Sequence, residues 1–138
     1  MSRTLEDHDT QVQQDGLLLE KKFGYGDGNG TGTTVTQLTS RTTGVTINSV
    51  TGTITTNNAS LAAEAAAVFT VTNNKVGIND VPQVAIQSGS NGGNTDLVVT
   101  TVANNSFNIA VVNNNAAAGT AETGAIIINF MILKGTVT

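Results

Sequence analysis

From residue 33 onward the chain is a succession of short runs in which apolar residues alternate with threonine or asparagine, and Gly, Asn or Ser separates one run from the next. A period of two places the apolar side chains on one face of a strand and the polar side chains on the other. The runs that follow this pattern are residues 33–39, 44–47, 52–56, 67–73, 81–87, 95–103, 106–113 and 124–135. About eight short strands, with no amphipathic helix between them, predict an all-β fold, an antiparallel β-sandwich or a jelly-roll-like body.

Two segments need a separate interpretation. Residues 57–68, "NNASLAAEAAAV", are rich in alanine but show no stripe with a period of 3.6, so we expect a loop or a single helical turn there. Pro82, the only proline, stands at the start of its run, where a missing N–H disturbs a strand least. We expect the large side chains inside the runs to form the core, and we place these residues on the inward face: Phe69, Phe107, Ile127 and Phe130.

The first 23 residues differ in composition from the rest, because they hold eight of the sixteen Asp, Glu, Lys and Arg residues and the only histidine. The chain of 138 residues is long enough for one domain and an appendage. We therefore predict an arm over residues 1–23, a glycine-rich hinge over 24–32 and a β-sandwich body over 33–138. The arm residues expected to bind a partner are Leu5, Val12, Leu17, Leu18, Leu19, Lys21, Lys22 and Phe23. The glycines expected to give the hinge its freedom are Gly24, Gly26, Gly28, Gly30 and Gly32.

The charge pattern argues against two classes of partner. The net charge of −4 and the lack of a basic cluster beyond Lys21 and Lys22 give no field that would attract a phosphate backbone, so we expect no binding to nucleic acid. The longest apolar run, residues 125–133, is interrupted by Asn129 and is too short to span a bilayer, so we expect no membrane anchor. The first residues contain no apolar h-region, which indicates production without Sec export.

Few residues point to chemistry. Asp27, Asn29 and Thr31 begin a loop like that of a calcium site, but Leu38 stands where the bidentate glutamate is needed, so we favour a hinge and expect neither a metal nor a cofactor. The only histidine, His8, lies in the arm, so a nucleophilic side chain in the body would have no histidine base beside it. The body has four carboxylates, which we expect to be solvated in or beside turns: Glu64, Asp80, Asp96 and Glu122. These observations favour a protein that is not an enzyme.

Three stretches of the sequence resemble a known kind of small β-domain. The run "GTGTTVTQLTSRTTGVTINSVTGTITT", followed by "AAVFTVTNN" and ending in "INFMILKG", resembles the small Thr-rich β-domains of virion proteins in tailed bacteriophages and cyanophages, particularly capsid decoration (cement) proteins. The resemblance covers residues 28 to 135 and brings no catalytic residues with it. It implies a jelly-roll-like subunit that forms a homotrimer at threefold or quasi-threefold positions, binds the major capsid protein and joins neighbouring capsomers.

The expected function is therefore that of a non-enzymatic virion protein that decorates the capsid exterior and stabilises the shell. Its expected location is the capsid surface, after assembly in the host cytoplasm. The body has so few charges on its strands that we expect sister subunits to cover some of its faces, giving a homo-oligomer, a trimer by the resemblance. The alternative function is a receptor-binding or fibre-tip module of a phage tail, although the chain shows neither the heptads nor the repeats of a fibre.

Overall fold

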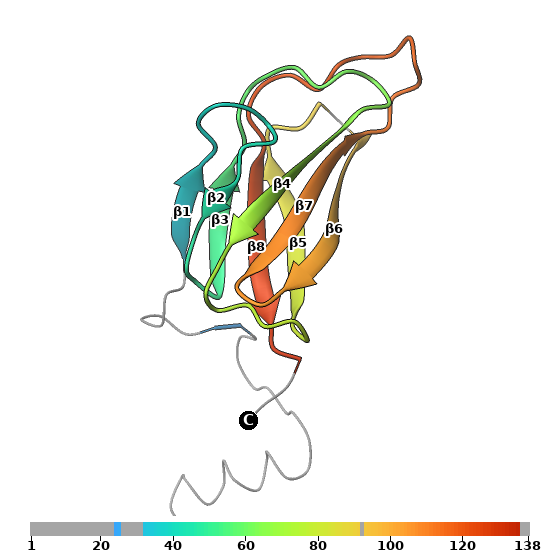
Figure 1. The fold of residues 1–138 in the computed structure, drawn as a ribbon. Coiled ribbons are helices and arrows are strands. Elements are labelled where there is room, and N and C mark those ends of the chain that lie inside the picture. The colour runs from blue at the N-terminus through green and yellow to red at the C-terminus, as the bar shows by residue number, and fades with distance from the viewer. Residues whose placement is uncertain (1–23, 26–31, 92, 136–138) are drawn as a thin grey trace, which may run out of the picture.

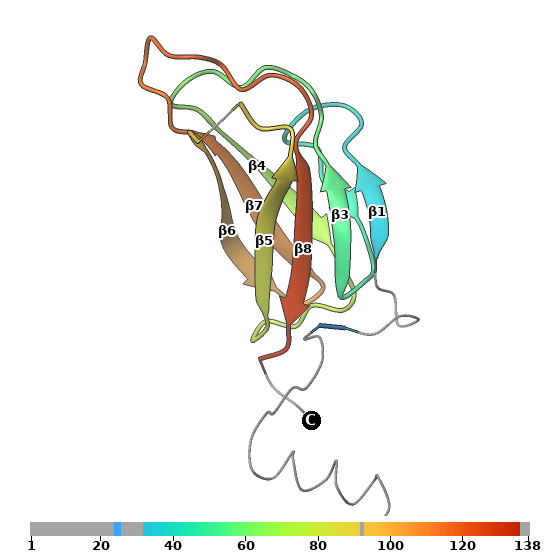
Figure 2. The ribbon, with the colours of Figure 1, turned by 180° about the vertical axis from the view of Figure 1, so that it is seen from behind.

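The protein forms two four-stranded sheets that face each other (Figures 1 and 2). The structure is a computed structural model, and it describes residues 24–25, 32–91 and 93–135. Sheet A has the strand order β1 (Thr33–Thr36), β3 (Thr51–Thr55), β8 (Ile127–Leu133) and β5 (Val81–Ser88). Sheet B has the order β2 (Val45–Thr46), β4 (Ala66–Thr72), β7 (Ser106–Asn113) and β6 (Thr95–Ala103). The described residues contain no helix. Of the alanine-rich segment, residues 57–65 form a loop as expected, whereas residues 66–68 belong to β4. The prediction of an all-β, sandwich-like body of about eight strands is confirmed.

The sheets are mixed, whereas the sequence predicted antiparallel pairing. The central pairs β3–β8, β5–β8, β4–β7 and β6–β7 are antiparallel, but β1 pairs with β3 and β2 pairs with β4 in parallel. The cause is the path of the chain, which alternates between sheets from β1 to β5. Because each crossing reverses the direction of the chain, β1 and β3 in sheet A run the same way, as do β2 and β4 in sheet B.

The core lies between the two sheets, where the inward side chains of both meet. Phe69, Phe107 and Phe130 are buried, as predicted, and the rings of Phe107 and Phe130 from opposite sheets lie 5.9 Å apart at a tilt of 54°. The prediction for Ile127 is wrong, because this residue is only half-buried and faces outward. Its neighbour Ile128 is fully buried instead.

The register of β8 explains this difference. Ile128 pairs with Ile54 of β3 on one side and with Ile86 of β5 on the other, so three isoleucines form one inward row across sheet A. Gly52 pairs with Phe130 in the same sheet, and a Cβ atom at Gly52 would lie 2.9 Å from the Phe130 ring. The strand must carry a glycine there, because real Cβ atoms do not approach other heavy atoms so closely.

The edge strands of the sandwich have features that disfavour pairing with a strand of another molecule. Pro82 lies on the edge strand β5, opposite Ile132 of β8. The N–H of Ile132 points the other way and donates to the carbonyl of Val50 on the β3 side, so Pro82 and Ile132 are not a hydrogen-bonded pair. The missing N–H of Pro82 therefore removes no bond to β8. The register shifts in β5 between Ile86 and Ser88 and in the other long edge strand, β6. Bulges and a proline thus protect the long edges in place of charged residues.

Candidate functional site

The outer face of sheet A carries no charged residue on its four strands. The four strands of sheet A contain no Asp, Glu, Lys, Arg or His, and the eight strands together contain a single charged residue, Asp96 in β6. Three rows of paired residues cross this face, through Met131, Asn129 and Ile127 of β8. The outward residues are Thr34, Thr36, Thr51, Thr53, Thr55, Val81, Gln83, Ala85, Gln87, Ile127, Asn129, Met131 and Leu133.

The surface charge of the rest of the body is also low. Seven charged residues lie in the described part of the chain, and three of them, Arg41, Asp80 and Glu122, are buried. The body therefore meets its surroundings mainly through hydroxyl, amide and aliphatic groups. Such a surface suits contact with another uncharged protein surface, because few charges lose their water when the two surfaces meet.

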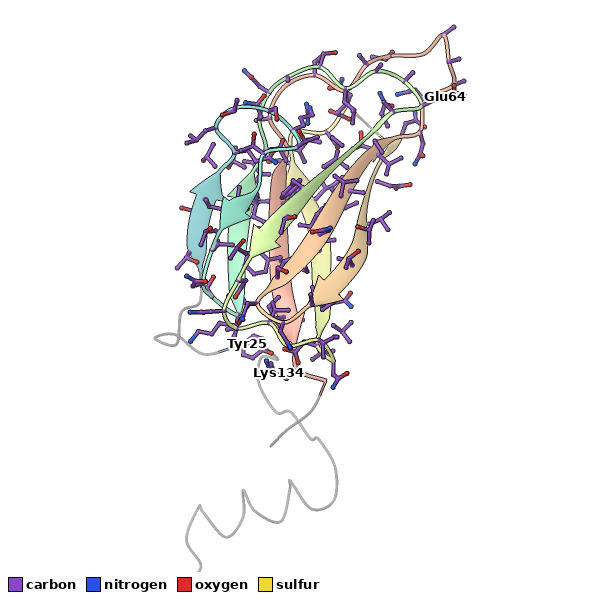
Figure 3. The ribbon with its side chains drawn as sticks, viewed as in Figure 1. Tyr25, Glu64 and Lys134 are labelled. Atoms are coloured by element: carbon purple, nitrogen blue, oxygen red, sulfur yellow. The ribbon has the colours of Figure 1, made fainter. Side chains whose placement is uncertain are left out.

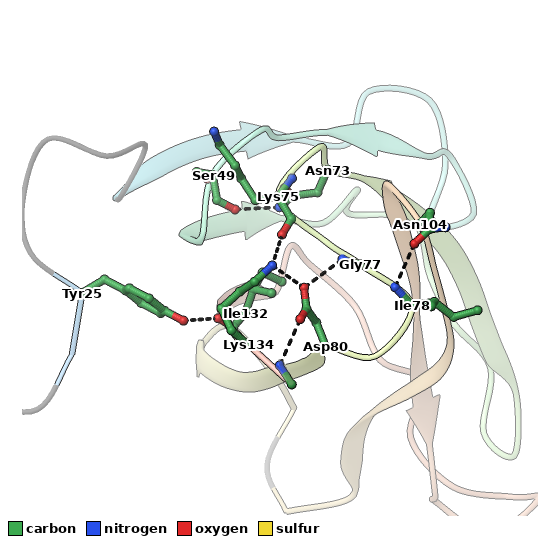
Figure 4. A network of polar contacts seen from close by, with 11 residues as sticks. Tyr25, Ser49, Asn73, Lys75, Gly77, Ile78, Asp80, Asn104, Ile132 and Lys134 are labelled. Carbon is green, nitrogen blue, oxygen red and sulfur yellow. Dashed lines mark hydrogen bonds and ion pairs between the residues drawn. The ribbon is translucent and has the colours of Figure 1, made fainter. Parts of the chain in front are cut away.

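Tyr25 attaches the N-terminal side of the chain to the end of β8. Its hydroxyl donates a hydrogen bond to the carbonyl of Ile132, which lies just beyond the last β3–β8 pair, Thr51 with Met131 (Figure 4). Figure 3 places Tyr25 and Lys134 at the same end of the sandwich, which we call the Tyr25 end. Tyr25 lies within the predicted hinge, so the chain has an attachment to the body inside that segment.

The Tyr25 end is more apolar than the rest of the described surface. Four of the seven large hydrophobic side chains that are exposed gather there: Tyr25, Ile78, Val81 and Leu133. Val81 pairs with Leu133 at the end of sheet A. A pocket of about 190 Å³ opens beside them and is lined by Gly24, Tyr25, Met131, Leu133 and Lys134.

Asp80 and Lys134 form an ion pair beside this pocket, with 2.5 Å between Lys134 Nζ and Asp80 Oδ2 (Figure 4). The backbone N–H groups of Gly77 and Gly135 also donate to the Asp80 carboxylate, at 2.8 and 3.0 Å. Lys134 donates a further bond to the carbonyl of Lys75. Burial alone raises the pKa of Asp80, but the bonds from Lys134, Gly77 and Gly135 and the charge of Lys134 outweigh it, so the pKa lies below its usual range.

A second buried polar cluster lies at the other end, where Figure 3 shows Glu64. Arg41 donates to the carbonyl of Gly124 at 2.7 Å, and the Glu122 carboxylate accepts the N–H of Asn91 at 2.9 Å. Burial lowers the pKa of Arg41, and the charge of Glu122 opposes that shift. Among the described residues no buried side-chain polar atom lacks a partner, so these groups hold loops together and present no free functional group.

The expectation that the four body carboxylates are solvated turn residues is wrong for Asp80 and Glu122, which are buried. It holds for Glu64, which is exposed in a turn, and for Asp96, which is exposed beside a turn at the start of β6. The sequence gives little sign of which carboxylates are buried, because the buried ones bond to partners from distant segments of the chain, such as Lys134 for Asp80.

The residues predicted to bind a partner in the arm lie outside the described part of the chain, as do three hinge glycines, Gly26, Gly28 and Gly30. Gly24 and Gly32 are exposed at the two ends of the hinge. Gly32 has a φ of 70°, and its N–H donates to the carbonyl of Thr51 at 3.2 Å. Tyr25 was missed as a contact residue, although the only tyrosine of the chain, set among glycines, was a usable signal.

Comparison of the chain with protein-family models, with curated proteins and with solved structures finds no match. Within residues 24–25, 32–91 and 93–135, no three His, Cys, Asp or Glu side chains gather in a group that could hold a metal ion. That part of the chain also contains no helix with the length and hydropathy needed to cross a bilayer. The candidate site is therefore a pair of surfaces, the outer face of sheet A and the Tyr25 end.

Proposed function

We propose that this chain is a non-enzymatic structural protein that decorates the exterior of a viral capsid, binds the major capsid protein and stabilises the shell by joining capsomers. The observation that carries the proposal is the outer face of sheet A, whose four strands lack any charged residue. The surface of a free domain usually carries charged residues of both signs, whereas charged residues are depleted in the core of a protein interface. The resemblance of residues 28–135 to capsid decoration proteins supplies the identity of the partner.

The arm has a part in this function. Leucines at positions 17–19 offer apolar anchors, and the acidic residues around them keep the segment compatible with water. Tyr25, two residues after the arm, donates a hydrogen bond to the carbonyl of Ile132 in β8, and this attachment to sheet A supports a part for the arm in binding to the shell.

Binding to shells tests the proposal. The shells are assembled from the major capsid protein of the phage that carries this gene, without decoration protein, and the full chain is added in a co-sedimentation assay. We expect saturable binding and a higher melting temperature of the shell. Deletion of residues 1–23 leaves the β-type circular dichroism unchanged and weakens binding.

A matched pair of variants tests the face itself. Asn129→Lys places a charge at the centre of the outer face of sheet A, and Thr70→Lys places the same charge on the outer face of sheet B. Both positions are exposed, so both variants should fold. We expect the first to reduce shell binding about tenfold or more, since a buried unpaired charge is costly, and the second to bind normally. Equal binding by both variants would exclude sheet A as the contact face.

The location of the protein in purified particles separates this function from that of a receptor-binding or fibre-tip module. Density for the chain at threefold or quasi-threefold positions of the capsid is the expected result of electron microscopy. Density at the tail would replace the proposal with the alternative.

A further inference from the structure

The pocket at the Tyr25 end is built to receive an aliphatic side chain. Tyr25, Met131 and Leu133 supply most of its lining, and its volume of about 190 Å³ exceeds that of apolar protein cavities of ~150 Å³ that bind a benzene-sized molecule. Ile78 and Val81 extend the apolar surface beyond the pocket. In the part of the chain that the structure describes, Tyr25, Ile78, Val81 and Leu133 are exposed and Met131 is half-buried.

Two cations flank this apolar surface. Lys75 is exposed, and Lys134 keeps 43% of its side chain accessible while it bonds to Asp80 and to the carbonyl of Lys75. The buried Asp80 carboxylate offsets the charge of Lys134, so Lys75 leaves the three groups with a net positive charge beside the pocket. A ligand that fits this end has an aliphatic centre and acidic flanks.

One segment of this chain has that pattern. Residues 15–20 read "DGLLLE", with three consecutive leucines between Asp15 and Glu20. No other part of the sequence has three consecutive leucines. The segment belongs to the 23 residues that precede Gly24, and Gly24 is itself part of the pocket lining.

We propose that Leu17, Leu18 and Leu19 of a second copy of this chain bind the pocket at the Tyr25 end, with Asp15 and Glu20 facing Lys75 and Lys134. Copies of the chain then join through exchanged arms. This proposal deepens the proposed function and rests on it for its biological setting, because it names the neighbouring subunit as the partner of the arm.

The sequence next to the pocket favours a second copy over the arm's own body. To return to its own pocket, the arm would need a tight turn between Leu19 and Gly24. The intervening residues, Glu-Lys-Lys-Phe, include none of the Gly, Pro, Asn, Asp or Ser residues that form such turns. An extended chain of five residues spans up to ~17 Å, so an arm without a turn would carry its leucines away from their own pocket and toward a neighbouring copy.

Cysteine cross-linking tests the exchange, because the chain contains no cysteine of its own. Leu18→Cys and Leu133→Cys are made in separate full-length chains, mixed under oxidising conditions and separated without reductant. We expect a disulfide-linked dimer that contains one chain of each kind. The control partner is Leu38→Cys, which offers an 83% exposed leucine outside the Tyr25 end and should give little cross-linking. If Leu133→Cys fails to fold, Val81→Cys replaces it, because the two residues are paired.

Other outcomes overturn the proposal. A chain that carries both Leu18→Cys and Leu133→Cys and closes only on itself would show that the arm binds its own body. Cross-linking to Leu38→Cys as strong as to Leu133→Cys, or no cross-linking at all, would show that the arm does not use this pocket.

Sedimentation without shells gives an independent measurement. Replacement of the three leucines by serine should weaken self-association by more than about tenfold and leave the circular dichroism unchanged. No shells are present in this experiment, so unchanged association would contradict arm exchange without bearing on binding to the capsid. In the same way, a full chain that does not bind shells would contradict the proposed function without bearing on arm exchange.

Discussion

At the scale of single residues, the body depends on a few buried polar groups that join segments distant in sequence. Asp80 receives bonds from Gly77, Gly135 and Lys134. Asn73 is fully buried at the end of β4, and its side-chain amide donates to the carbonyl of Ser49 at 2.7 Å (Figure 4). These groups stabilise the loops because an unpaired polar group in the same place would lose its hydrogen bonds to water.

The ionisation of Asp80 makes stability depend on pH. The pKa of Asp80 is lower in the folded protein than the ordinary value near 3.9, so the ionised carboxylate stabilises the fold above about pH 4. This stabilisation is lost as the pH falls through the folded pKa. We expect Asp80→Asn to lower the free energy of unfolding at pH 7 by about 2 kcal/mol and to flatten the acid limb of a melting-temperature profile.

Asp96→Asn is the matched control, because Asp96 is the exposed carboxylate of β6. It should change the melting temperature little and leave the acid limb as steep as in the parent. An acid limb of equal slope in Asp80→Asn and the parent would show that Asp80 does not control the pH dependence.

At the scale of secondary structure elements, β8 is the strand that organises sheet A. It lies between β3 and β5 and pairs with both. The sequence around β8, "AIIINFMIL", begins with four apolar residues that do not alternate with polar ones, so the pattern by itself leaves two registers possible. Pairing with Ile54 and Ile86 selects the register that buries Ile128.

Substitutions on the two faces of β8 test this register. Ile128→Ala removes a fully buried side chain and should lower the free energy of unfolding by about 2 to 5 kcal/mol. Ile127→Ala, one position away and half-buried, should lower it by about 1 kcal/mol or less. Chemical denaturation of both variants measures the difference. A larger loss for Ile127→Ala would mean that the strand has the opposite register.

At the scale of the whole molecule, the two sheets are held together by contacts between their inward faces. Phe107 of sheet B and Phe130 of sheet A meet across the core. The loops at each end add buried polar contacts, such as those of Arg41 and Glu122 at one end and of Asp80 at the other. The outer faces of both sheets take no part in these contacts.

Removal of one ring from the core should destabilise the whole sandwich. We expect Phe107→Ala to lower the free energy of unfolding by about 3 to 5 kcal/mol, a large part of the stability of a small domain. Thermal unfolding followed by circular dichroism measures the loss, and both sheets should melt in one transition. A melting temperature within about a degree of the parent would place Phe107 outside the core.

The sequence by itself determined the class of the fold, because alternation of threonine with apolar residues is local and sets which face of a strand is wet. The same patterns predicted a loop that the structure has at residues 57–65, and the burial of Phe69, Phe107 and Phe130. The tertiary structure alone decided the parallel pairing of β1 with β3, the register that turns Ile127 outward and the burial of Asp80 and Glu122. Each of these depends on partners far away in the chain, which no local pattern specifies. The attachment of Tyr25 to Ile132, across 107 positions, is of the same kind, and it brings an apolar pocket to the point where the arm joins the body.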